Sequence, residues 1–199
     1  MISELYLSAP FNKDRDIYHD DSKSNIDHGL FYFEDTFPDN HLYALSSCLM
    51  TKDDYDFIFM HPMNIDDAGH KFGVESKEYG NAVIQNDKLL STYIPQWINA
   101  GYSIIVGADH GMTKDCYHGG NSLEQRQTAL YIIDSRVIGG YHSKQLTTLE
   151  FAPLLCYLLG IQLTQKMKSL EEEFNHEHKE KLKILCISIN TIFYNCLVI

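Results

Sequence analysis

Three short apolar runs between residues 51 and 170 alternate with longer stretches in which polar residues are frequent. Each run is rich in aromatic and β-branched side chains and is bounded by polar residues, which is typical of strands that are buried on both faces. The runs occupy residues 55–60, 102–107 and 128–133. The pattern therefore predicts three buried strands in this part of the chain.

A long helix is predicted over residues 75–100, because its largest apolar side chains recur at helical spacing and Gly101 follows as a C-terminal cap. That face contains Val83, Leu90, Ile94 and Trp97. Pro95 can kink this helix or end it early. A second helix fits residues 148–159, with Gly160 after it. Strands and helices in this order predict an α/β fold with a mainly parallel sheet flanked by helices, whose ligands bind beyond the carboxyl ends of the strands.

Residues 1–50 show no sustained apolar period and are rich in Asp, Asn, Ser and His. Such a composition is typical of loops and turns. We therefore expect an irregular, loop-rich segment with one strand and one short helix. The α/β core is expected to follow over residues 51–170.

The C-terminal tail, residues 171–199, is first charged and then apolar. Our preferred interpretation is an arbitrary extension beyond an ancestral end near residues 160–170. A last strand or helix is an alternative. A tail anchor is a third interpretation, but the apolar part, Ile184–Ile199, is shorter than the about 20 residues that span a bilayer, and it contains Asn190 and Asn195.

The composition excludes several classes of partner and compartment. The 16 Lys and Arg residues against 27 Asp and Glu residues give a net charge of −11, which argues against binding to nucleic acid. A small phosphate compound stays possible, because a bound divalent cation reverses the sign of the local field. The five cysteines form no CxxC pair and predict no disulfide framework. No secretory signal begins the sequence as given, so we expect a cytoplasmic chain, unless an N-terminal signal has been lost.

Two polar clusters follow predicted strands and contain the residue types that bind metal ions. Asp66 and His70 come after the first strand, and Asp109 and His110 come after the second, with His118 further along the same loop. Carboxylate oxygens and imidazole nitrogens are ligands of zinc and, to a lesser extent, manganese. We expect Asp66 and His70 to face one ion across a short loop that Gly69 makes possible. His61, which follows the first strand, is interpreted as a polar strand end, and the alternative is that it supports the metal ligands from behind.

These motifs resemble the alkaline phosphatase superfamily. Asp66-x-x-Gly69-His70, the segment GADHGMT at residues 107–113 and His118-Gly-Gly are most similar to the type I phosphodiesterase/nucleotide pyrophosphatase branch. The spacing from DHGMT to HGG is also similar to that of GPI ethanolamine phosphate transferases. The resemblance covers about residues 55–165 and implies an alkaline-phosphatase-like core that lacks its N-terminal strands.

The resemblance implies two divalent metal ions, typically zinc. Asp66, His70 and His118 would bind the first ion, and Asp109 and His110 would bind the second. The family binds the second ion with two further groups, an Asp at the end of the first strand and a Thr or Ser nucleophile. Nothing in residues 1–50 fits these two groups, and Thr36 is interpreted as an ordinary loop residue. We therefore expect one complete metal site and assign no catalytic residue.

The predicted function is a metal-dependent phosphoric ester hydrolase, a phosphodiesterase or nucleotide pyrophosphatase acting on a small phosphate ester or nucleotide. Because the nucleophile and one metal-binding Asp are not found, we expect a fragment with little or no activity on its own, and a missing N-terminal fragment is a possible partner. One alternative is a phosphotransferase, mutase or sulfatase of the same superfamily. Another is a non-catalytic remnant that binds a metal ion.

Overall fold

The computed structural model of the chain describes residues 18–20, 26–32, 35–52, 54–134, 139–141, 145–167 and 183–188. The strands are β1 (Tyr18–Asp20), β2 (His28–Leu30), β3 (Phe57–Met60), β4 (Tyr102–Gly107), β5 (Leu130–Ile133) and β6 (Lys183–Ser188). The helices are α1 (Asp39–Lys52), α2 (Asn64–Phe72), α3 (Lys77–Asn99), α4 (Leu123–Arg126) and α5 (Thr148–Leu158). The predicted α/β fold is confirmed, and each strand and helix predicted within residues 51–170 is present.

The main sheet has the strand order β3-β6-β4-β5. β6 is parallel to both β3 and β4, whereas β5 is antiparallel to β4, so the sheet is mixed and mostly parallel. The carboxyl ends of β3, β6 and β4 therefore lie at the same edge of the sheet. Ligands of α/β proteins bind at this edge. β1 and β2 form a separate antiparallel pair.

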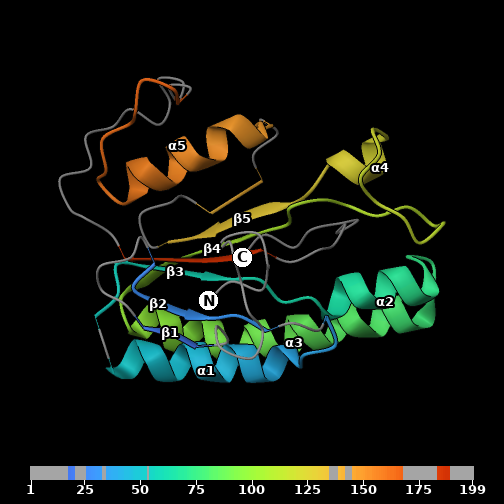
Figure 1. The fold of residues 1–199 in the computed structure, drawn as a ribbon, viewed down its shortest axis with the longest axis horizontal. Helices are drawn as coiled ribbons and strands as arrows, with labels where there is room; N and C mark the ends of the chain where they lie inside the picture. The colour runs from blue at the N-terminus through green and yellow to red at the C-terminus, as the bar shows by residue number, and fades with distance from the viewer. Residues whose placement is uncertain are drawn as a thin grey trace.

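The sheet separates two layers of helices, with α5 above it and α1 and α3 below it (Figure 1). Because side chains alternate along a strand, one strand supplies both cores. On β4, Ile104 packs into the core that contains α1 and α3, whereas Ile105 packs against α5. On β6, Leu185 packs into the core with α1 and α3, whereas Ile184 packs against α5. The sheet is thus buried on both faces, as its apolar runs predict.

α3 has the apolar face that the sequence predicts, and its start is capped. The Tyr79 amide donates a hydrogen bond to the Ser76 hydroxyl at the N-cap, at 3.1 Å. Trp97 is 1% exposed and donates its indole N–H to Ser47 Oγ on α1, at 2.8 Å. Pro95 does not end the helix, which continues to Asn99. α3 is therefore a rigid support that joins α1 to the sheet.

α1 is longer than the short helix expected within residues 1–50. It runs from Asp39 to Lys52 but buries only one narrow side, which contains Asp39, Leu42, Tyr43 and Ser46. Two of these four residues are polar, so the helical spacing of apolar residues that would predict a helix is weak. The helix is therefore stabilised by contacts with α3 that the local pattern does not show.

β6 corrects our interpretation of the C-terminal tail. Residues Lys183–Ser188 do not lie outside the core but form the strand between β3 and β4, so the alternative of a last strand is observed. The four residues from Ile184 to Ile187 are at most 2% exposed. A run of four apolar residues is typical of a strand buried on both faces. Because the run follows a charged segment, the sequence analysis did not place it in the core. The rest of the tail beyond residue 170 lies outside the described residues.

α2 corrects the predicted loop between Asp66 and His70. Both residues lie on the helix Asn64–Phe72, one turn apart and on the same face. Gly69 is inside this helix, so a special backbone conformation is not its role. A Cβ at Gly69 would collide with the Met112 sulfur, which shows that the glycine allows the loop after β4 to approach the helix closely.

Candidate metal centre

The loop after β4 brings His118 to α2. The Tyr117 carbonyl accepts hydrogen bonds from the Thr113 amide and the Thr113 hydroxyl, both at 3.0 Å, which folds the loop back on itself. Gly119 has φ +91°, a left-handed conformation that side chains rarely adopt. The Gly111 amide donates a hydrogen bond to the backbone carbonyl of Gln125 on α4, at 3.0 Å, which holds the start of the loop against α4. Residues about 50 positions apart in sequence therefore share one site.

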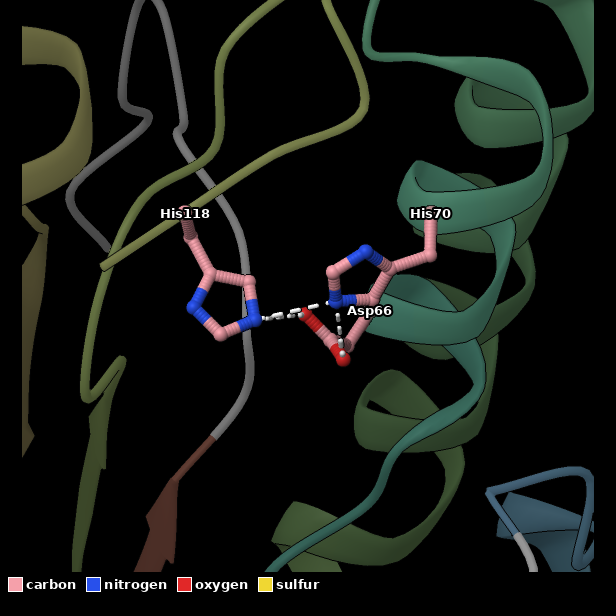
Figure 2. Close-up of side chains that lie close together, drawn as sticks. All are labelled: Asp66, His70 and His118. Carbon is pink, nitrogen blue, oxygen red and sulfur yellow. Dashed lines mark hydrogen bonds and ion pairs between the residues drawn. The ribbon is translucent and has the colours of Figure 1, made fainter. Parts of the chain in front are cut away.

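Asp66, His70 and His118 form a triad whose polar atoms point toward one another (Figure 2). Asp66 Oδ2 lies 3.5 Å from His70 Nε2, and Asp66 Oδ1 lies 3.8 Å from His118 Nε2. The two Nε2 atoms are 2.9 Å apart. Within the described ranges, this is the one group of at least three His, Cys, Asp or Glu residues whose donor atoms all lie within 4.8 Å of one another.

The hydrogen bonding of the triad fits a bound cation. Asp66 is 4% exposed, and its Oδ1 atom is buried without a hydrogen-bond partner. His70 Nδ1 lies 3.0 Å from the Cys116 carbonyl, which can only accept, so Nδ1 is the protonated nitrogen and Nε2 presents a lone pair. A buried carboxylate that faces imidazole lone pairs is costly unless a cation or a proton lies between them. The donor set of one carboxylate and two imidazoles is one that zinc accepts.

Burial also shifts the pKa values of Asp66 and His118 in the metal-free chain. Burial raises the pKa of Asp66, and the neighbouring His70, His110 and His118 oppose this increase. Burial, followed by the charge of His110, lowers the pKa of His118. A lowered pKa keeps the His118 ring neutral at physiological pH, which is the form that binds metal ions.

Asp109 and His110 lie beside the triad, at the end of β4. The His110 and His118 rings are stacked, with centroids 3.7 Å apart and an interplanar angle of 14°. Asp109 Oδ2 is 3.7 Å from His110 Nε2. His110 Nδ1 lies 3.0 Å from the Gly111 carbonyl, so its Nε2 also presents a lone pair. The structure thus places all five predicted residues at one edge of the sheet.

His61 also lies at this edge, where the sequence interpretation favoured an ordinary polar strand end over a place behind the metal ligands. It follows β3 directly, is 5% exposed, and its Nε2 lies 3.9 Å from Asp109 Oδ2. The only sequence feature that indicates a role is its position at the carboxyl end of a strand, next to the Asp66 motif. A histidine at a strand end is not specific, so the contact with Asp109 is visible only in the fold.

Comparison with known proteins identifies the family. The sequence profile of the type I phosphodiesterase / nucleotide pyrophosphatase family matches residues 3–179. The chain belongs to this family. It is therefore a member of a superfamily of proteins that act on phosphoric esters, and the resemblance that the motifs indicate is confirmed.

The relatives among curated proteins are named as transferases. The chain is 25% identical to human GPI ethanolamine phosphate transferase 3, catalytic subunit, over 127 residues, which are 62% of this chain and 11% of the relative. It is 24% identical to GPI ethanolamine phosphate transferase 2 of Schizosaccharomyces pombe over 196 residues, 81% of this chain and 26% of the relative. The chain thus spans between about a tenth and a quarter of these relatives. No solved structure matches it significantly.

In the part of the chain that the structure describes, no helix combines the length and the apolar character needed to cross a bilayer.

Proposed function

We propose that the chain binds a divalent cation, with zinc as the best fit, through Asp66, His70 and His118, and that this site acts on a phosphodiester. The observation that supports the proposal most strongly is the buried Oδ1 atom of Asp66, which has no hydrogen-bond partner and faces an imidazole nitrogen. Membership of the family supplies the substrate class, a phosphoric ester.

A cation held there would supply a Lewis acid that attracts a phosphoryl oxygen. The residues of the chain supply the site for it. Asp66 is fixed on α2 and provides the negative charge, and the Cys116 carbonyl orients His70 so that Nε2 points to the same place. His118 enters from the loop after β4, and its neutral ring adds a second nitrogen. The site is therefore assembled from a helix and a loop that the sheet holds together.

The acceptor of the phosphoryl group decides between hydrolysis and transfer. The family description favours a phosphodiesterase or nucleotide pyrophosphatase, for which the acceptor is water. The names of the relatives favour the second candidate, transfer of ethanolamine phosphate. Both activities begin with attack on a phosphorus atom, so the metal site serves either.

We expect slow turnover by the 199-residue chain alone. In the described residues, Asp109 and His110 interact with other imidazoles, each other and backbone groups, and no serine or threonine hydroxyl is hydrogen-bonded to either of them. A covalent route needs such a hydroxyl beside an activating group.

The test measures zinc-dependent binding of inorganic phosphate, a minimal analogue of the substrate, by calorimetry. We expect the zinc-loaded chain to bind phosphate, and the Asp66→Asn variant or the chain in EDTA to bind none. Equal binding with and without zinc would contradict the proposal. A bis-aryl phosphodiester measures turnover in the same samples, and a rate typical of enzymes would contradict the expected slow turnover.

A further inference from the structure

We propose that Cys116 is a positioning residue of the metal centre, and that it acts through the left-handed conformation of its backbone and not through its thiol. The inference rests on the proposed function, because it concerns the same cation site. It adds that one turn of the loop after β4 holds both imidazoles of the triad in place. Neither the family match nor the names of the relatives assign a role to Cys116.

The backbone of Cys116 has an unusual conformation. Its φ angle is 60°, and among the residues that the structure describes it is the one residue other than glycine with a positive φ. In this conformation the Cβ atom of an L-residue lies too close to the following carbonyl oxygen. Such a conformation persists only where the surroundings hold it, and it is most common at functional sites. The left-handed conformation of Cys116 must therefore be maintained by contacts of the loop.

Two features of the fold maintain this conformation. The Thr113 amide donates a hydrogen bond to the Tyr117 carbonyl, at 3.0 Å, and closes a turn around Cys116. On its other side the turn lies against Gly73, which follows α2. A Cβ at Gly73 would lie 2.9 Å from the Lys114 carbonyl oxygen and 3.4 Å from the Cys116 sulfur. The glycine thus leaves the space that the turn occupies.

The same turn fixes two of the three ligands. The Cys116 carbonyl lies 3.0 Å from His70 Nδ1, so it accepts the ring proton and leaves a lone pair on Nε2. His118 follows closely along the chain, and its Nε2 lies 2.9 Å from His70 Nε2. A change of Cys116 to a negative φ would turn this carbonyl away from His70 and redirect the chain that leads to His118. Both imidazoles therefore depend on one backbone conformation.

The thiol of Cys116 is not needed for this role. Cysteine sulfur is a common zinc ligand, but the Cys116 sulfur is not part of the group whose donor atoms all lie within 4.8 Å of one another. The part of Cys116 that contacts a metal ligand is its backbone carbonyl. A substitution that keeps the left-handed backbone should therefore keep the site, even when it removes the thiol.

The experiment measures the zinc dissociation constant of variants of the full 199-residue chain, by titration against a chelating indicator. Cys116→Gly removes the thiol and adopts a left-handed conformation readily, so we expect it to bind zinc at least as tightly as the unaltered chain. Cys116→Val keeps a small apolar side chain, but its branched Cβ disfavours a positive φ, so we expect the constant to rise about tenfold or more. Cys48→Val, at an exposed position of α1, is the matched control and should leave the constant unchanged.

A second measurement reports which nitrogen of His70 carries the proton, by two-bond proton–nitrogen spectra of the metal-free chain at a pH at which the ring is neutral. We expect the proton on Nδ1 in the unaltered chain and in Cys116→Gly, because both keep the carbonyl in place. In Cys116→Val we expect a mixture of the two tautomers, because the carbonyl no longer selects one. A role of Cys116 in the stability of the loop alone would not change this signal.

Weaker zinc binding by Cys116→Gly would show that the side chain matters and would overturn the inference. Equal binding and the same tautomer in all variants would also overturn it, while leaving the proposed function intact. If Cys116→Val does not fold, Cys116→Gly alone decides between these outcomes. No zinc binding by the unaltered chain would contradict both the inference and the proposed function.

Discussion

Asp66 Oδ1 lies 3.8 Å from His118 Nε2, although Asp66 is on α2 and His118 belongs to the loop after β4. The contact joins the two motifs that the sequence separates, and the oxygen has no hydrogen-bond partner to balance its burial. This buried, unpaired oxygen destabilises the metal-free chain. The same oxygen is available to bind a cation.

Asp66→Asn is expected to weaken zinc binding and to stabilise the metal-free chain. Loss of a direct ligand should raise the zinc dissociation constant by at least about 100-fold. Burial raises the pKa of Asp66, so the charged form is disfavoured and a neutral amide should raise the melting temperature in EDTA. Zinc titration and thermal unfolding measure the two effects. A lower melting temperature in EDTA would contradict the explanation.

Asp39 is expected to make the stability depend on pH. Burial raises its pKa from the usual 3.8 to about 6, against hydrogen bonds from Asn64 and Asn86. Because the folded-state pKa is raised, the contribution to stability is complete below about pH 4 and is lost as the pH rises through about 6. The loss by neutral pH is about 3 kcal/mol.

Urea unfolding of the metal-free chain at several pH values measures this effect. Asp39→Asn should remove most of the decrease between pH 4 and 8. Asp87→Asn, at an exposed position of α3, should leave the decrease unchanged. The same pH profile in all three proteins would show that Asp39 is not responsible.

Gly69→Ala is expected to destabilise the chain by about 1–3 kcal/mol, because the new methyl group would collide with Met112. Gly80→Ala is the matched control, since Gly80 is also helical and a Cβ there meets nothing within 4 Å. That substitution should stabilise the chain by about 0.5–1 kcal/mol. Chemical denaturation measures the free energy of unfolding of both variants. Equal effects of the two substitutions would show that Met112 does not lie against Gly69.

Leu185→Ala tests whether β6 belongs to the core. Leu185 is fully buried between β3 and β4, so its truncation should cost about 2–5 kcal/mol of unfolding free energy. Leu149→Ala on α5 is the control, because that side chain is 74% exposed. A negligible effect of Leu185→Ala would restore the interpretation of this segment as an extension outside the fold.

The sequence predicted the parts of the fold in which the local pattern and the tertiary structure agree. The run at β4 is mostly apolar because both faces of the strand are buried, so the strand was evident. β6 has the same character, but its place in the sheet depends on pairing with strands more than 75 residues away, which no local pattern encodes. α1 was underestimated for a related reason, since its contacts are with α3.

The candidate site, like the fold, was predictable from the sequence only in part. Aspartate, histidine and glycine at strand ends indicated the five predicted ligands, and the fold gathers them. The helical path between Asp66 and His70 was not foreseen, because a helix and a loop can both place two residues four positions apart on one side. The sequence left His61 between a strand end and a support of the metal ligands, and its contact with the Ser188 carbonyl of a distant strand was not foreseen.

The most direct test of the metal centre is anomalous diffraction at the zinc edge from crystals of the zinc-loaded chain. We predict an anomalous peak among Asp66, His70 and His118, at bonding distance from Asp66 Oδ1. Crystals that diffract well but show no peak there, or show zinc only at other residues, would contradict the central claim.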